Sequence, residues 1–126
     1  MKIERIDHIV LTVLDIEETC RFYSGVMGMK RVNFGDGRVA LHFGNQKINL
    51  HQVDKPVDVN VLHATRGAAD ICLVTDSTID EILKTLSIKN VKLIEGPCIR
   101  TGAMGAISSV YFYDPDENLI EVSTYK

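Results

Sequence analysis

The alternation of hydrophobic and polar residues predicts a βαβββ order of elements in the first half of the chain. Between the first two strands, apolar residues recur at helical spacing from Ile16 to Met27. Asp15 is suited to cap this helix, and Glu18 three residues later completes a capping box. The predicted strands, rich in β-branched and apolar residues, cover 6–13, 32–34, 39–43 and 47–53.

The second half of the chain repeats this order. Thr78 and Glu81 form a second capping box, and the apolar residues that follow them lie at i, i+3, i+4 and i+7, which predicts a helix with one face packed on a sheet. Residues 96–105 are predicted to form a glycine-containing loop. The predicted strands cover 70–75, 91–95, 108–113 and 119–124.

The repeat defines the predicted fold class and domain organisation. The chain is expected to be α+β, with two βαβββ modules in a single domain over residues 1–126. Module one covers about 1–54, and module two covers about 68–126. The residues between them, about 55–67, contain Pro56 and lose periodicity, so they are predicted to form a linker.

Four potential metal ligands fall at positions that the repeat relates in pairs. His8 and Asp70 lie in the first strands of the two modules, and His51 and Glu121 are expected to occupy the same place in the last strands. Because alternate strand residues share a face, all four point away from the apolar face that meets the helices. Arg38, His42 and Asn49 are predicted to lie on the same side as His51. A single strand histidine is more often a hydrogen-bonded polar residue than a ligand, but four residues in this pattern favour a metal site.

Composition narrows the function classes. The 126 residues are 45% hydrophobic and 25% charged, with a formal net charge of −3, which is typical of a soluble globular protein. No basic stripe indicates nucleic-acid binding, and no apolar run approaches the roughly 20 residues that a membrane span requires. We therefore expect a cytoplasmic protein. The spacing of the three cysteines indicates neither a disulfide framework nor a thiolate metal site. Cys72 is expected to be a small buried hydrophobe, and Cys98 is the candidate for an exposed, reactive thiol.

Four segments form an ordered set of motifs: DHIVLTV at 7–13, RFYSGVMGM at 21–29, DICLVT at 70–75 and VYFYDPDENLIEV at 110–122. This set resembles the vicinal oxygen chelate superfamily, which contains lactoylglutathione lyase, fosfomycin-resistance enzymes, extradiol dioxygenases and bleomycin-resistance proteins. The resemblance covers nearly the whole chain. The segments GPCIRTGAMG and KINLHQ look most similar to small glyoxalase-domain proteins, some of which are described as virulence-associated.

The resemblance implies two βαβββ modules that curl a sheet into a cup, with a divalent metal held by residues of the first and last strands. His8, His51 and Glu121 match ligand positions, while Asp70 stands where many members have histidine. Zn, Ni, Mn and Fe(II) all suit such mixed nitrogen and oxygen ligands. A homodimer and a small-molecule substrate are also implied. In the DPDEN turn, Glu117 stands where relatives often have glycine.

The leading functional hypothesis is a glyoxalase-like lyase or isomerase that acts on a small substrate chelated through vicinal oxygens. Glu121 is the candidate general base, and Asp70 is the alternative. Arg100 and Thr101, with His42 and Asn49, are the candidate substrate-binding residues, although Arg100 on a mobile surface loop is an open alternative. Two other functions remain open: a metal-free protein that sequesters a small molecule, and an extradiol-type dioxygenase.

Overall fold

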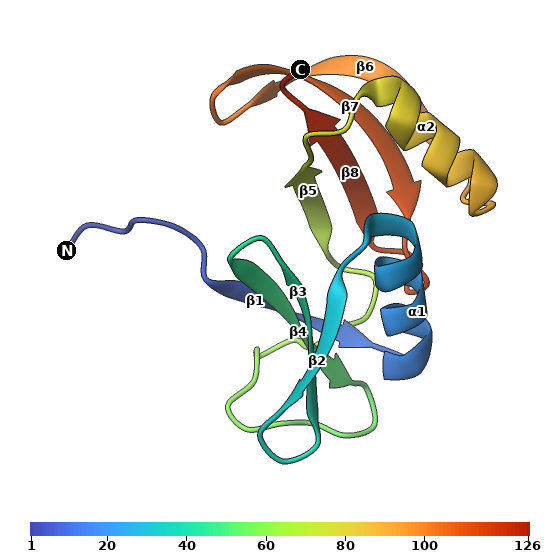
Figure 1. Cartoon of the computed structure of the whole chain (residues 1–126). Helices are drawn as coiled ribbons and strands as arrows, with labels where there is room; N and C mark the ends of the chain where they lie inside the picture. The colour runs from blue at the N-terminus through green and yellow to red at the C-terminus, as the bar shows by residue number, and fades with distance from the viewer. The chain divides into compact units, whose positions relative to one another are not determined.

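The structure, a computed structural model, describes all residues from 1 to 126. The chain divides into two compact units, Met1–Gly67 and Ala68–Lys126, and each unit has the predicted βαβββ order (Figure 1). The α+β prediction is therefore confirmed, with one four-stranded mixed sheet in each unit. No helix has the length and apolar character needed to cross a bilayer.

The first unit pairs its first and last strands in parallel. The order across its sheet is β1-β4-β3-β2, and helix α1 (Ile16–Met27) packs on β2, β3 and β4. Asp15 caps α1 by accepting a hydrogen bond from the Glu18 amide, and Gly28 ends it in the left-handed conformation. The strands are β1 (His8–Val13), β2 (Lys30–Phe34), β3 (Arg38–Phe43) and β4 (Gln46–Gln52).

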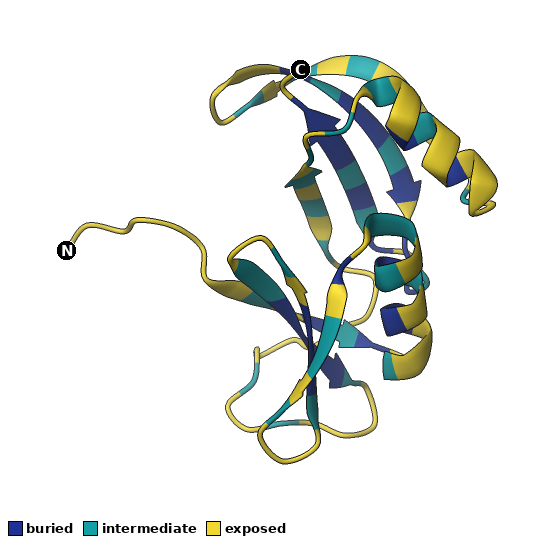
Figure 2. Cartoon of the chain, viewed as in Figure 1, coloured by how far each residue is buried: buried dark blue, intermediate teal, exposed yellow.

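The second unit repeats this topology, with the sheet order β5-β8-β7-β6. Helix α2 (Ile79–Ile88) has the predicted capping box at Thr78 and Glu81, and it packs on β7 and β8 through Ile82 and Leu86. Buried residues follow the central strands of each sheet (Figure 2). The strands are β5 (Asp70–Val74), β6 (Glu95–Gly102), β7 (Gly105–Tyr113) and β8 (Leu119–Thr124).

The sequence prediction was wrong about residues 91–105. The predicted strand 91–95 contains regular strand structure only at Glu95, whereas the predicted loop is mostly strand β6, joined to β7 by a tight turn between Gly102 and Gly105. The register of the β6–β7 ladder shifts between Glu95 and Cys98. Because β6 lies at the sheet edge, this irregularity accommodates Pro97, which has no N–H to donate.

Candidate functional site

The strand pairings within each unit show which positions of the two repeats correspond, and they correct one prediction. In the parallel β1–β4 pair, Val10 lies opposite Asn49, and in the parallel β5–β8 pair, Cys72 lies opposite Glu121. Val10 and Cys72 are each the third residue of the first strand of their unit, so the residues opposite them, Asn49 and Glu121, are counterparts. The prediction that His51 is the counterpart of Glu121 is wrong by two residues. His8 and Asp70 are counterparts as predicted, since both begin the first strand of their unit.

The predicted metal ligands are divided between the units, two in each. His8 pairs with Lys47, whereas His51 lies four residues further along β4, about 13 Å away at the rise of a β-strand. Asp70 is exposed and pairs with Leu119, two residues before Glu121. No three His, Cys, Asp or Glu side chains form a group that could hold a metal ion.

Within each unit, these residues do not fit a metal ion on their own. The metal centre of His8, His51, Asp70 and Glu121 stays a prediction.

Both ring nitrogens of His51 already have partners within the first unit. An Arg38 guanidinium nitrogen lies 3.2 Å from Nε2, and the Asn60 side-chain oxygen lies 3.3 Å from Nδ1. Since Arg38 can only donate, Nε2 is the acceptor and Nδ1 carries the proton that is donated to Asn60. His8 is instead exposed, with its Nδ1 2.8 Å from Asp7.

The second unit contains a cavity of about 450 Å³ on the side of its sheet that carries Glu121. Glu121 is the only carboxylate that lines this cavity, and Arg100 is the only cation. Val74, Ala103 and Ile107 supply apolar surface. The other lining residues are Cys72, Thr101, Gly102, Tyr111 and Tyr125.

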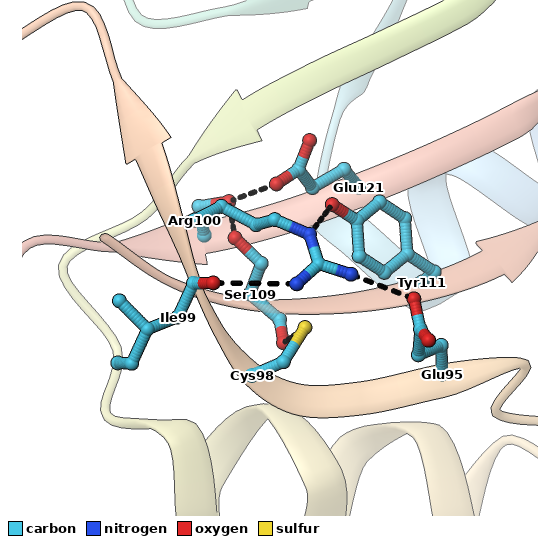
Figure 3. Close-up of polar contacts among 8 residues, drawn as sticks. Glu95, Cys98, Ile99, Arg100, Ser109, Tyr111 and Glu121 are labelled. Carbon is cyan, nitrogen blue, oxygen red and sulfur yellow. Dashed lines mark hydrogen bonds and ion pairs between the residues drawn. The ribbon is translucent and has the colours of Figure 1, made fainter. Parts of the chain in front are cut away.

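A row of polar side chains crosses the sheet at this cavity (Figure 3). Arg100 donates from Nη2 to Glu95 at 2.7 Å and from Nε to the Tyr111 hydroxyl at 3.0 Å. The Tyr111 hydroxyl in turn donates to Glu121, which lies directly opposite it across the β7–β8 ladder. Glu95 thus fixes Arg100, and Arg100 orients the tyrosine proton toward Glu121.

The environment of Tyr111 keeps its hydroxyl protonated. Burial raises its pKa above the ordinary value of 10.0, and the hydrogen bond to Glu121 raises it further, while Arg100 opposes both effects. Tyr111 is therefore a neutral hydrogen-bond donor at physiological pH, beside a carboxylate.

On its other side, Glu121 meets a group of small polar side chains. The Ser123 hydroxyl lies 3.5 Å from a Glu121 oxygen and 2.7 Å from the buried Ser109 hydroxyl. The Cys72 sulfur lies 3.3 Å from Ser123. Cys72 is therefore not the buried hydrophobe predicted, because its side of β5 faces the cavity and not helix α2.

The thiols of Cys72 and Cys98 lie in different environments. Desolvation of the sulfur raises the pKa of Cys72, Ser123 lowers it, and the Glu121 and Asp70 charges raise it further. This thiol is thus held in its protonated, weakly nucleophilic form. Cys98 is half-buried, and its sulfur lies 3.7 Å from the Ser109 carbonyl oxygen.

Two of the four predicted substrate-binding residues line the cavity of the second unit, and the other two lie in the first sheet. Arg100 and Thr101 line the cavity, and Arg100 belongs to β6 and not to a mobile loop. His42 and Asn49 lie on the His51 side of the first sheet, as predicted, but His42 is exposed and Asn49 is buried. Tyr111 was predicted from the sequence to be a packing residue and was not among the predicted site residues. Its pairing with Glu121 could have been found by counting outward from the DPDEN turn of the hairpin.

Known proteins resemble this chain over its whole length. It is 47% identical over 125 residues to the virulence protein STM3117 of Salmonella typhimurium, which covers 99% of this chain and 87% of that relative. An integron cassette protein of V. cholerae has a solved structure with 52% identity and a TM-score of 0.98, covering 100% of this chain and 98% of the other.

A more distant likeness concerns the fold alone. A lactoylglutathione lyase from Agrobacterium tumefaciens is 23% identical with a TM-score of 0.76, over 98% of this chain and 96% of the other. Residues 5–122 match the family described as Glyoxalase/Bleomycin resistance protein/Dioxygenase superfamily, and the chain therefore belongs to this superfamily.

Proposed function

We propose that the chain is a glyoxalase-like enzyme that acts on a small oxygenated molecule in the cavity of the second unit, with Glu121 as the general base. The observation that carries this proposal is that Glu121 is the only carboxylate lining the cavity. It has a neutral hydroxyl donor, Tyr111, on one side and Ser123 on the other.

The roles follow from the hydrogen bonds. Glu121 accepts a proton from a carbon next to a carbonyl. Once Glu121 is protonated, the Tyr111 hydroxyl turns its single proton from Glu121 to the oxygen on which negative charge develops. Arg100 acts through Tyr111, because its Nε donates to the phenol oxygen. Its charge is partly balanced by Glu95, so Arg100 is a positioning residue in this proposal.

The deuterium exchange of hydroxyacetone in D2O tests this proposal without knowledge of the natural substrate. Hydroxyacetone is a small ketone with vicinal oxygens, and proton NMR follows the loss of the hydrogens beside its carbonyl. We expect the wild-type protein to accelerate exchange and Glu121→Gln to lower this acceleration by about 100-fold or more. Glu117→Gln, which removes an exposed carboxylate outside the cavity, is the matched control.

The apolar part of the lining supports a second candidate, the sequestration of a small molecule without catalysis. The two functions differ in their dependence on Glu121. If the wild-type protein exchanges hydroxyacetone no faster than buffer, the catalytic proposal is wrong. A bound ligand whose affinity changes less than about threefold in Glu121→Gln would then favour sequestration.

The metal and the dimer belong to the same proposal as expectations from the family. His8, His51, Asp70 and Glu121 remain the proposed ligands, and the ion would supply a Lewis acid for oxygens of the substrate. A homodimer is proposed because the family resemblance implies one. Light scattering on the purified chain measures the oligomeric state.

A further inference from the structure

The strands of the two sheets carry opposite charge. Those of the first unit contain four Lys or Arg residues and no Asp or Glu. Those of the second unit contain Asp70, Glu95 and Glu121 with a single cation, Arg100. The counterparts Asn49 and Glu121 are part of this difference, since a neutral amide stands in the first sheet where a carboxylate stands in the second.

Two of the cations in the first sheet lie together on the side away from α1. The Arg38 guanidinium lies 4.8 Å from the centroid of the Phe34 ring, and the Lys47 ammonium lies 4.1 Å from the same centroid. Arg38 forms no ion pair, and its only side-chain hydrogen bond is to His51. The nearby carboxylate that interacts with Lys47 is Asp7, which is exposed and bonded to His8 and Arg5. Neither Arg38 nor Lys47 is therefore within ion-pair distance of a carboxylate.

A buried hydrogen-bond acceptor without a partner lies on the same face. Asn49 is 5% exposed, and its side-chain oxygen Oδ1 is buried with no hydrogen-bond donor. Ala40 pairs with Asn49 across β3–β4 and offers no polar group. An unmet buried acceptor costs about 1–3 kcal/mol, so a ligand that donates to Oδ1 would gain binding energy. Asn49 and Arg38 are diagonal neighbours on this face, because Asn49 pairs with Ala40, two residues along β3 from Arg38.

We propose that Arg38, Lys47 and Asn49 form a binding site for a small carboxylate that bears a hydroxyl group on the neighbouring carbon. The carboxylate accepts from Arg38 and is attracted by Lys47, and the hydroxyl donates to Asn49 Oδ1. An ammonium donor in place of the hydroxyl would be repelled by the two cations, and an unprotonated phosphate has no donor for Asn49. Asn60 orients the ring of His51, and the hydrogen bond between Arg38 and His51 holds Arg38 in place in this site. The proposal uses residues of the first unit only, and it stands whether or not Glu121 is a base.

Titration of the 15N-labelled chain with glycolate, followed by NMR at the Asn49 side-chain amide and the β3 and β4 backbone amides, tests this site. Glycolate has both features of the proposed ligand, acetate lacks the hydroxyl, and ethylene glycol lacks the charge. We expect saturable shifts with glycolate, binding about fivefold weaker with acetate, and none with ethylene glycol. Equal affinity for glycolate and acetate, or shifts that do not saturate, would overturn the proposal.

Variants assign the two contacts separately. Arg38→Gln should weaken glycolate binding about tenfold or more, whereas Arg21→Gln, on the exposed side of α1, should leave it unchanged. Asn49→Leu should remove the preference for glycolate over acetate. Asn49→Asp should abolish binding of both, and it keeps the test decisive if Arg38→Gln fails to fold. Retention of the preference in Asn49→Leu, or an equal loss in Arg21→Gln, contradicts the proposed contacts.

Discussion

Glu117 occupies a backbone conformation that glycine adopts more readily. Its φ is 65°, in the left-handed region, as the departure of the DPDEN turn from the family pattern suggested. We expect Glu117→Gly to raise the free energy of unfolding by about 1 kcal/mol, measured by urea denaturation. Asn90 also has a positive φ, 56°, but asparagine tolerates this region, so Asn90→Gly should gain less. A loss of stability in Glu117→Gly would show that its side chain outweighs the backbone strain.

Tyr111 provides a titration test of the polar row at the cavity. Burial and the hydrogen bond to Glu121 raise its pKa, and Arg100 lowers it. Glu121→Gln should therefore lower the Tyr111 pKa, and Arg100→Gln should raise it. The 13Cζ resonance of labelled tyrosine, assigned with Tyr111→Phe, measures both. Shifts in the same direction in the two variants would contradict the arrangement.

The raised pKa of Tyr111 has a consequence for stability. The folded state holds the phenol proton more tightly than the unfolded state, so the stabilisation is present below about pH 10 and is lost as the pH rises through the folded pKa. Because the hydroxyl is partly exposed, we expect this loss of stability to be small in the wild-type protein and smaller still in Glu121→Gln. The free energy of unfolding in urea, measured at pH 8 and at alkaline pH, compares the wild-type protein with this variant.

Sequence patterns predicted the faces of these residues better than their partners. Strand parity correctly placed Asn49 and His42 on the His51 side, because side chains alternate strictly along a strand. The prediction missed that Asn49 and Glu121 occupy equivalent positions in the two repeats. The register between β1 and β4 is set by contacts between residues distant in sequence, so it could not be predicted locally. The contact between Arg38 and His51 could not be read from spacing alone, since it depends on the path of a long side chain.

At the scale of the elements, β6 depends on the glycine at position 96. A Cβ on Gly96 would lie 2.5 Å from the Ser109 carbonyl oxygen, and the φ of Gly96 is 107°. We expect Gly96→Ala to disrupt the β6–β7 pairing and lower stability by several kcal/mol, on the order of 2–4. Gly25 is the matched control, because it lies within α1 with nothing within 4 Å of its Cβ position. Gly25→Ala should raise stability by about 0.5–1 kcal/mol in the same thermal or urea unfolding measurement.

Both helices and most strands could be predicted because capping residues and periodicity are local signals. Asp15, Thr78 and Glu81 make the contacts expected from their spacing. Strand β6 was missed because two glycines and Pro97 interrupt its apolar pattern, and its pairing with β7 is recognised only once the hairpin is formed. Local composition indicated a loop where a tertiary partner imposes a strand.

At the scale of the whole molecule, the metal content of the purified chain tests the proposed four-residue metal centre. If His8, His51, Asp70 and Glu121 act together, gently purified protein should carry about one divalent ion per chain. His8→Ala and Glu121→Ala should each lose it, as measured by elemental mass spectrometry. No bound ion after reconstitution with Zn, Ni, Mn and Fe(II) would contradict the four-residue centre. The cavity of the second unit and the proposed site at Arg38, Lys47 and Asn49 would then remain as separate binding sites.

The parallel pairing of first and last strands sets the order in which each unit can assemble. The hairpins β3–β4 and β7–β8 join strands that are close in sequence, whereas β1–β4 and β5–β8 must close about 40 and about 50 residues of chain. The hairpins are therefore expected to form first, and the parallel ladders last. In pulse-labelled hydrogen exchange during refolding, amides of Val110 and Val122 should gain protection before those of Leu11 and Leu73. The residues that carry the proposed chemistry in β7 and β8 would then be in register before either sheet is complete.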